Sequence, residues 1–333
     1  MARRGSRSIA NAVDSDRIIR LWLLRILVLL GGHREFARAN GFSNDAVAEM
    51  IGLGHWIDPS PNDFDLNAVQ SELRLLHQKA EKQWAKAPLP ACLRNNIGQL
   101  SNLVGLSATD CRILEFAVLI HIEPLLDDTA DWLGHISSAK AYHALSAILN
   151  LPEPEIRASL SEQGLLARAG LVAVDRSGTN WLRSKLDLLS PGFADLMVSS
   201  ETDPISLLRG TVSAAGPAQL NLSDYGHINA SLEILRPYLR RAATTGRRGV
   251  NIFLHGAPGT GKSQLARALA DELGCELFEV ASDNDEGDPV NGERRLRAFR
   301  AAQSFFAQRR ALIAFDEVED VFNDGDSFFG RKS

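Results

Sequence analysis

The residues with the clearest chemistry form one short glycine-rich segment. It reads Gly256, Ala257, Pro258, Gly259, Thr260, Gly261, Lys262 and Ser263. The pattern GxxxxGK[ST] lets a loop curl so that its backbone N–H groups face a phosphate. The lysine can reach the β- and γ-phosphates, and the hydroxyl that follows it can ligate Mg²⁺. An apolar stretch precedes the loop and a helix-forming stretch follows it, which favours a nucleotide site over a structural glycine turn.

A second chemical feature lies about fifty residues further along the chain. The apolar run from Ala311 to Phe315 ends in two adjacent acids, Asp316 and Glu317. A strand of an open α/β sheet would deliver both carboxylates at the edge where ligands of such sheets bind. Asp316 would hold Mg²⁺ directly or through water, and Glu317 would orient or deprotonate the attacking water. Many strands end in a solvated acid, but this pair at this distance from the loop indicates a catalytic site.

These two segments define the expected site and its ligands, ATP and Mg²⁺. The predicted catalytic residues are Lys262, Asp316 and Glu317. Ser263 and Asp316 are the predicted metal ligands. The nucleotide-binding residues are expected to be Gly256 to Ser263, together with Gln264 directly after the loop.

The elements that must position these residues alternate along the last third of the chain. The expected strands are 250–255, 276–281 and 311–315, and the expected helices are 263–273 and 293–308. Strands that alternate with helices predict a parallel sheet. The fold class is therefore α/β, with a P-loop NTPase sheet over residues 225–333.

The first two thirds of the chain predict different structure. Residues 1–90 indicate a mostly helical region, with one helix beginning near Asp16 and another over 66–86. Residues 91–198 predict a winged-helix-like domain, because a helix–turn–helix pattern precedes an apolar strand at 171–175 and a return strand at 180–183. Residues 199–224 are rich in Ser, Thr, Gly, Pro and Ala, which favours a linker.

The sequences GAPGTGKS and LIAFDE resemble the Walker A and Walker B motifs of AAA ATPases. The resemblance covers residues 225–333, and the preceding domain resembles the winged helix of some bacterial AAA proteins. It implies ATP hydrolysis coupled to remodelling or regulation of a macromolecular partner. It also implies a homo-oligomeric ring, a hexamer, whose N-terminal domains recruit a protein. The segment Tyr225 to Ile228 lies where such proteins contact adenine, which adds Ile228 to the nucleotide-binding residues.

The sequence departs from that family in two places. The chain stops at Ser333, before the strands and helical lid that carry sensor 1, the arginine finger and sensor 2 in the family. We therefore expect a fragment or a truncated product, with an incomplete sheet, weakened ATP binding and little hydrolysis by this chain alone. Residues 288–292 contain no aromatic residue, so that gripping a threaded polypeptide there is not expected.

Four arginines stand in the second expected helix of the ATPase region. They are Arg294, Arg295, Arg297 and Arg300. The simplest interpretation is a solvated face, and contact with a neighbouring subunit is the alternative.

Composition limits the other classes of function. The net charge is -5, and residues 107–190 hold seven Lys and Arg against eleven Asp and Glu, which disfavours binding to nucleic acid. Three scattered cysteines and the absence of a long apolar run predict a cytoplasmic protein without a membrane span. Three alternatives stay open: a nucleotide-gated binding module with negligible turnover, an ATP-regulated DNA-binding protein and a small-molecule kinase.

Overall fold

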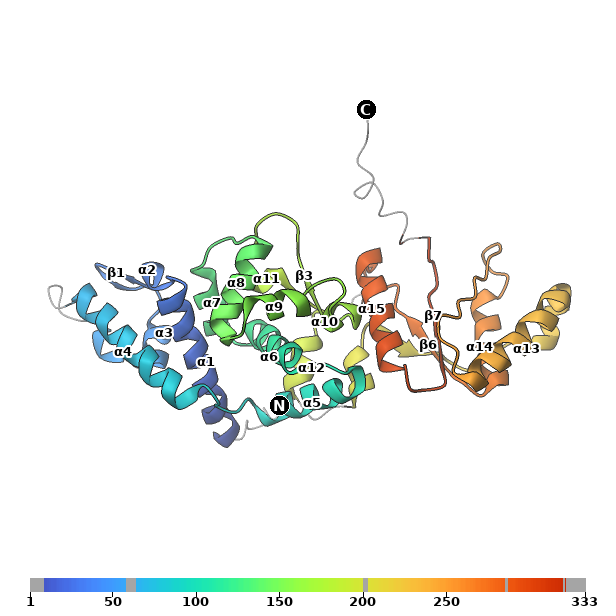
Figure 1. Cartoon of the computed structure of the whole chain (residues 1–333). Coiled ribbons are helices and arrows are strands. Elements are labelled where there is room, and N and C mark those ends of the chain that lie inside the picture. The colour runs from blue at the N-terminus through green and yellow to red at the C-terminus, as the bar shows by residue number, and fades with distance from the viewer. Residues whose placement is uncertain (1–8, 58–63, 200–202, 285–286, 320, 322–333) are drawn as a thin grey trace, which may run out of the picture. The chain divides into compact units, whose positions relative to one another are not determined.

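The chain divides into two compact units, Met1–Leu207 and Leu208–Ser333. The structure is a computed structural model that describes residues 9–57, 64–199, 203–284, 287–319 and 321 (Figure 1). The first unit is mostly helical, whereas the second contains a three-stranded sheet with helices. Among the described residues, no helix has the length and apolar character needed to span a membrane.

Two long helices form the start of the first unit, α1 (Ile9–Leu29) and α4 (Leu66–Trp84). Helix α1 begins seven residues before the expected start at Asp16. The buried Arg25 of α1 donates to the carboxylate of Glu81 in α4, at 2.7 and 2.8 Å, which lowers the pKa of Glu81. The shorter elements here are α2 (His33–Phe36), β1 (Ala37–Arg38), β2 (Gly41–Phe42), α3 (Asp45–Ile51) and η1 (Gly54–Trp56).

The remainder of the first unit packs around the apolar helix α6 (Ala108–Ile122). Ser107 and Asp110 form a capping box at its N-terminus, which satisfies backbone donors that the helix cannot. Around it lie α5 (Ala91–Val104), α7 (Pro124–Asp131), α8 (Ser138–Leu149), α9 (Glu153–Ser159), α10 (Leu165–Arg168), β3 (Val172–Val174), α11 (Leu182–Lys185), β4 (Leu186–Leu188), α12 (Phe193–Ser199) and η2 (Pro204–Leu208).

The order of elements from α8 to β4 resembles the predicted helix–turn–helix with a two-stranded wing, but the second strand of the wing, β4, begins at Leu186 and not at the predicted residue 180. β3 pairs with β4 in antiparallel register. The return strand expected at 180–183 lies later in the chain, because Asn180 forms only an isolated bridge with Ile136 and helix α11 begins at Leu182. The fully buried Lys185 at the end of α11 holds the turn after β3, because its ammonium donates to the carbonyls of Asp175, Ser177 and Gly178 at 2.8 to 3.1 Å. The winged-helix assignment itself stays a prediction.

The sheet of the second unit has the order β5-β6-β7 and is mixed rather than parallel. β6 (Glu276–Val280) and β7 (Ala311–Ala314) are parallel, as expected. β5 (Val212–Ala214) pairs with β6 in the antiparallel direction. The expectation of a linker over 199–224 is therefore wrong for β5, because its backbone joins the sheet despite its small polar residues.

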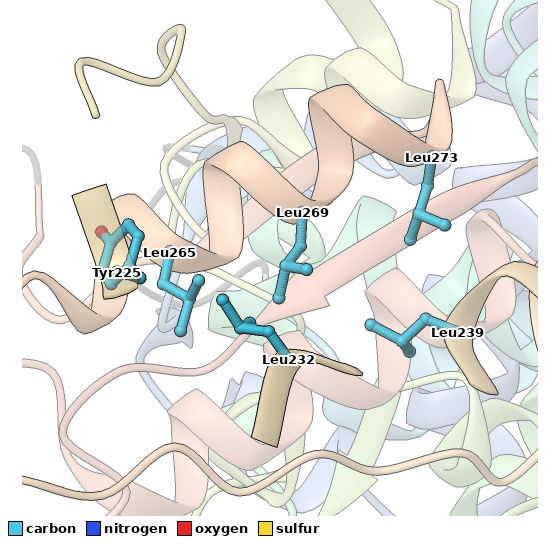
Figure 2. Close-up of a cluster of buried hydrophobic side chains, with 6 residues drawn as sticks. All are labelled: Tyr225, Leu232, Leu239, Leu265, Leu269 and Leu273. Atoms are coloured by element: carbon cyan, nitrogen blue, oxygen red, sulfur yellow. The ribbon is translucent and has the colours of Figure 1, made fainter. Parts of the chain in front are cut away.

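Three helices of this unit pack through a leucine cluster, namely η3 (Leu222–Ile228), α13 (Asn229–Thr245) and α14 (Lys262–Leu273). The fourth, α15 (Gly292–Phe305), packs against the strands of the sheet. Figure 2 shows Leu265, Leu269 and Leu273 in a row along α14, facing Leu232 and Leu239 of α13. Spacing of four residues places leucines on one helix face. The buried ring of Tyr225 lies at the start of this row, beside the glycine-rich loop.

The stretch before the glycine-rich loop differs from the prediction. Residues 250–255 were expected to form a strand, but no strand is assigned there. Val250 and Leu254 pack against the leucine cluster, whereas Phe253 is 72% exposed. Apolar residues predict burial, but a strand also needs a neighbour for its backbone hydrogen bonds. Among the described strands, none is paired with this segment.

Candidate functional site

The glycine-rich loop curls through backbone angles that favour glycine. The φ angles of Gly256, Gly259 and Gly261 are 153°, 79° and 82°. L-residues rarely adopt such angles, so the three glycines are required by the path of the chain. At Gly261 space is limiting as well, because an added Cβ would lie 3.0 Å from the Tyr225 hydroxyl oxygen. Gly261 is also the N-cap residue of α14, so the loop leads directly into a helix N-terminus.

The lysine of the loop reaches back over the residues that precede it. The Lys262 ammonium donates to the carbonyls of Gly256 at 3.0 Å and Ala257 at 3.2 Å. The Thr260 hydroxyl donates to the same Ala257 carbonyl at 2.8 Å. A flexible, charged donor thus lies at the mouth of the loop, together with the positive end of the 12-residue helix α14. This combination attracts anions.

The acidic pair meets the loop at one contact. The Ser263 hydroxyl donates to the Asp316 carboxylate at 2.8 Å, although 53 residues separate them in the sequence. Asp316 follows closely after β7, so the parallel sheet brings the carboxylate to the first turn of α14. Glu317 is exposed, and its backbone N–H donates to the Asp316 carboxylate at 3.0 Å.

The donor set at this contact fits a hard divalent cation. Mg²⁺ takes oxygen ligands and keeps several waters, using few protein groups. Ser263 and Asp316 supply a hydroxyl and a carboxylate oxygen within 2.8 Å of each other. Both residues are exposed, which leaves room for water and phosphate oxygens. The two predicted metal ligands therefore lie together as expected.

Two other predicted residues contact the rest of the fold. The Gln264 side-chain oxygen accepts from the backbone N–H of Gln219 at 2.8 Å, so this side chain holds the preceding segment. Ile228 ends η3 and packs, partly buried, against the leucine cluster. Its contact with adenine stays a prediction.

Tyr225 is a residue whose role the sequence did not reveal. Its hydroxyl donates to the Gly261 carbonyl at 2.8 Å, and its ring is buried. Burial, and to a smaller degree the nearby Asp224, raises the pKa of the Tyr225 hydroxyl, which keeps it in the donating form. The resemblance places the segment Tyr225 to Ile228 near the nucleotide, but no spacing in the sequence links the Tyr225 hydroxyl to Gly261.

The predicted arginine face is only partly solvated. Arg294 and Arg300 are exposed, as expected. Arg295 and Arg297 are buried, at 1% and 7% exposure, so the prediction of a solvated face is wrong for them. The reason is their position on the side of α15 that also buries Ala298 and Phe305.

Comparison with known proteins agrees with this geometry. Residues 252–332 match the family described as "ATPase family associated with various cellular activities (AAA)". This part of the chain is similar to AAA ATPases. The match includes the glycine-rich loop and the acidic pair, and it extends beyond the described residues. It supports nucleotide binding by the second unit.

Several curated proteins of this type are similar to parts of the chain. The ATPase family gene 2 protein homolog B of Mus musculus is 34% identical over 110 residues, which are 31% of this chain and 15% of that protein. Fidgetin-like protein 1 of Homo sapiens is 27% identical over 143 residues, 40% of this chain and 21% of that protein. An uncharacterised AAA domain-containing protein of Schizosaccharomyces pombe is 28% identical over 132 residues, 37% and 17% of the two chains. The chain thus spans about a fifth or less of these relatives. No solved structure matches it.

Proposed function

We propose that the second unit binds ATP with Mg²⁺ at residues 256–263 and hydrolyses it with the help of Asp316 and Glu317. The observation that carries the proposal is the 2.8 Å contact between the Ser263 hydroxyl and the Asp316 carboxylate. It joins a phosphate-binding type of loop to an acidic strand end, and each part alone would be weak evidence. The similarity of residues 252–332 to AAA ATPases supports the same activity.

Binding would begin at the loop mouth. Lys262 now donates to two neutral carbonyls, and phosphate oxygens would accept stronger, charge-assisted hydrogen bonds. We therefore expect the ammonium to exchange its carbonyl partners for the phosphates of ATP. The curled glycine backbone and the N-terminus of α14 add further N–H donors to this site.

Hydrolysis would use the acidic pair. Mg²⁺, held by Ser263 and Asp316, would neutralise charge on the phosphates. Glu317 would accept a proton from water while the water oxygen forms a bond to the γ-phosphorus. The bond from the γ-phosphorus to the β–γ bridging oxygen then breaks, giving ADP and inorganic phosphate. Lys262 would stabilise the charge on the phosphate oxygens.

Two variants test the proposal. Lys262→Ala should weaken binding of ATPγS by at least tenfold, because a charged hydrogen bond contributes about 1.5–3 kcal/mol. Arg248→Ala removes an exposed cation elsewhere in the same unit and serves as the matched control. Calorimetric titration measures both. Undiminished affinity of the Lys262→Ala variant would refute the phosphate-binding role.

Glu317→Gln tests hydrolysis separately. It removes the proton acceptor but keeps the size of the side chain, so single-turnover release of phosphate should slow by about 100-fold. Binding of ATPγS should stay unchanged. The comparison applies where the unaltered chain releases phosphate faster than ATP in buffer alone. Equal rates in the two proteins above that background would exclude a catalytic carboxylate at residue 317, whereas no release above background by the unaltered chain would favour the nucleotide-gated binding module.

We further propose that ATP turnover drives remodelling or regulation of a macromolecular partner, with the first unit as the recruiting part and a homo-oligomeric ring as the assembly. The relatives' family membership supports this wider role. Residues 288–292 supply no aromatic side chain for gripping a polypeptide, which favours action on a folded partner. Light scattering with and without Mg²⁺ and ATPγS tests the assembly, and a monomer under both conditions would contradict a ring formed by this chain.

A further inference from the structure

Arg295 extends from α15 to the end of β7. Arg295 is buried, with 1% relative exposure. Its Nη1 donates to the carbonyl of Glu317 at 3.2 Å, and its Nη2 donates to the carbonyl of Asp316. The guanidinium carbon also lies 4.6 Å from the centre of the Phe315 ring, within the range of a cation–π contact. One arginine therefore contacts three consecutive residues at the strand end.

The backbone that Arg295 contacts is in an uncommon conformation. Glu317 has a φ of 48°, in the left-handed region that residues with a Cβ rarely occupy. Such a conformation persists only where the surroundings hold it, and it is common at functional sites. Two contacts hold it here. One is the hydrogen bond from Nη1 to the Glu317 carbonyl, and the other is that from the Glu317 N–H to the Asp316 carboxylate.

We propose that Arg295 is a positioning residue for the acidic pair. By binding the two carbonyls, it fixes the peptide planes from which both carboxylates project, so that Asp316 faces Ser263. Arg295 does not need to touch the nucleotide for this role. The proposal rests on the proposed function, since it assigns a purpose to the orientation of Asp316 and Glu317.

Arginine suits this task better than lysine. A guanidinium is planar and presents several N–H donors in a fixed fork, which matches two carbonyls at once and stacks on an aromatic ring. A lysine ammonium is a compact charge on a flexible stem. Arg295→Lys should therefore recover only part of the effect lost in Arg295→Met, which removes every donor but keeps an apolar stem.

The chain offers a matched control on the same helix. Arg294 precedes Arg295 directly and is exposed. Arg294→Met changes the net charge by the same amount and leaves the strand end untouched. Phe315→Leu removes the ring beneath the guanidinium but keeps both carbonyl hydrogen bonds, so that it separates stacking from hydrogen bonding.

The first experiment measures ATPγS affinity of the full chain by calorimetry, in excess Mg²⁺ and in excess EDTA. The dissociation constant in EDTA divided by the dissociation constant in Mg²⁺ reports how well Asp316 supports the metal. For Arg295→Met this ratio should fall by about 10- to 100-fold, the usual effect of removing an outer partner of a metal ligand. The affinity in EDTA should stay within about twofold of the unaltered chain, because the loop and Lys262 are intact.

Three results would decide against the idea. An unchanged ratio in Arg295→Met would overturn it. An equal loss of affinity in Mg²⁺ and EDTA would show general damage to the unit instead of positioning. A ratio that falls as far in Arg294→Met would trace the effect to net charge.

The second experiment needs no nucleotide and separates this proposal from the proposed function. Hydrogen exchange at the amide of Glu317 should accelerate by about tenfold or more in Arg295→Met, because a charged hydrogen bond that holds the segment is lost. Arg294→Met should leave it unchanged. If the unaltered chain does not bind ATPγS, the proposed function fails, and with it the purpose assigned to Arg295. If binding is normal but exchange at Glu317 is the same in both variants, the positioning role alone fails.

Discussion

The hydroxyl of Tyr225 offers a test of how the glycine-rich loop is held. It donates to the Gly261 carbonyl at 2.8 Å, and the same carbonyl accepts the backbone N–H of Leu265 at 2.8 Å. Tyr225→Phe removes the first bond and keeps the ring, which is 3% exposed and packed on the leucine cluster. The change is therefore close to the deletion of one hydrogen bond at the point where the loop becomes a helix.

The expected magnitude follows from that single bond. A neutral intramolecular hydrogen bond contributes about 1 kcal/mol net. Since about 1.4 kcal/mol corresponds to a factor of ten, the local opening equilibrium at the start of α14 should rise about fivefold. The leucines of the cluster keep their contacts, so that amides further along α14 should change less.

The assay must report on the second unit alone. All five tryptophans lie between residues 22 and 181, in the first unit, so tryptophan fluorescence would miss this change. Hydrogen exchange at the Leu265 amide is the direct measurement, and Tyr225→Phe should accelerate it about fivefold. Tyr238→Phe is the control, because Tyr238 is 41% exposed and lies in the same unit. Equal exchange at Leu265 in the two variants would refute the idea that the Tyr225 hydroxyl fixes the loop.

Three further predictions concern the first unit. Hydrogen bonds from Ser177, with smaller contributions from Asn180 and Lys185, lower the pKa of Asp175 from 3.8 to about 2. Because the pKa of Asp175 is lower in the folded protein than in the unfolded one, the carboxylate stabilises the fold fully above about pH 4, and this stabilisation disappears as the pH falls towards 2. Acid unfolding followed by tryptophan fluorescence should show no such loss of stability from Asp175 in the Asp175→Asn variant. Lys185→Met should destabilise the unit by about 3–5 kcal/mol in urea unfolding, because it removes a buried ammonium that pairs with Asp175 and donates to three loop carbonyls. Lys140→Met, at an exposed position, should have little effect. Residues 107–190 hold an excess of acids, so a salt titration against duplex DNA should show no steep dependence of affinity on salt, and a steep slope would revive a DNA-binding role.

The loop and the acidic pair were predictable because their chemistry is local. Three glycines in the pattern from Gly256 to Ser263 permit the backbone angles that the curled loop needs. The distance between the two motifs leaves room for α14, β6 and the crossover helix α15, which joins the parallel strands β6 and β7. The meeting of Ser263 and Asp316 could therefore be expected from order and spacing.

The sheet was harder to predict because pairing depends on neighbours. β5 lies in a segment of small and polar residues, which gave no strand signal, and it forms through hydrogen bonds to β6. Residues 250–255 gave the opposite error, with apolar side chains but no paired strand. The presence of a paired strand beside 212–214, and its absence beside 250–255 among the described residues, accounts for both differences. A single stretch of sequence does not show whether such a partner strand is present.

The role of Arg295 was missed, although a signal was present. The buried face of α15 contains Arg295, Ala298, Ala302 and Phe305, at intervals of three or four residues. This interval marks one side of a helix. Arg295 thus falls on the apolar stripe and Arg294 beside it. Charge alone does not distinguish these two arginines, whereas their positions on the helix do.

The left-handed backbone at Glu317 has a consequence for mutational tolerance at that position. Any side chain with a Cβ carries a conformational cost there of about 1–2 kcal/mol, which glycine avoids. A Glu317→Gly chain should therefore be more stable than one with Glu317→Gln, while both lack the carboxylate. A β-branched residue such as valine should be tolerated least. Selection on folding alone would consequently favour glycine at residue 317, so a glutamate that persists there across a mutational library would mark selection for chemistry.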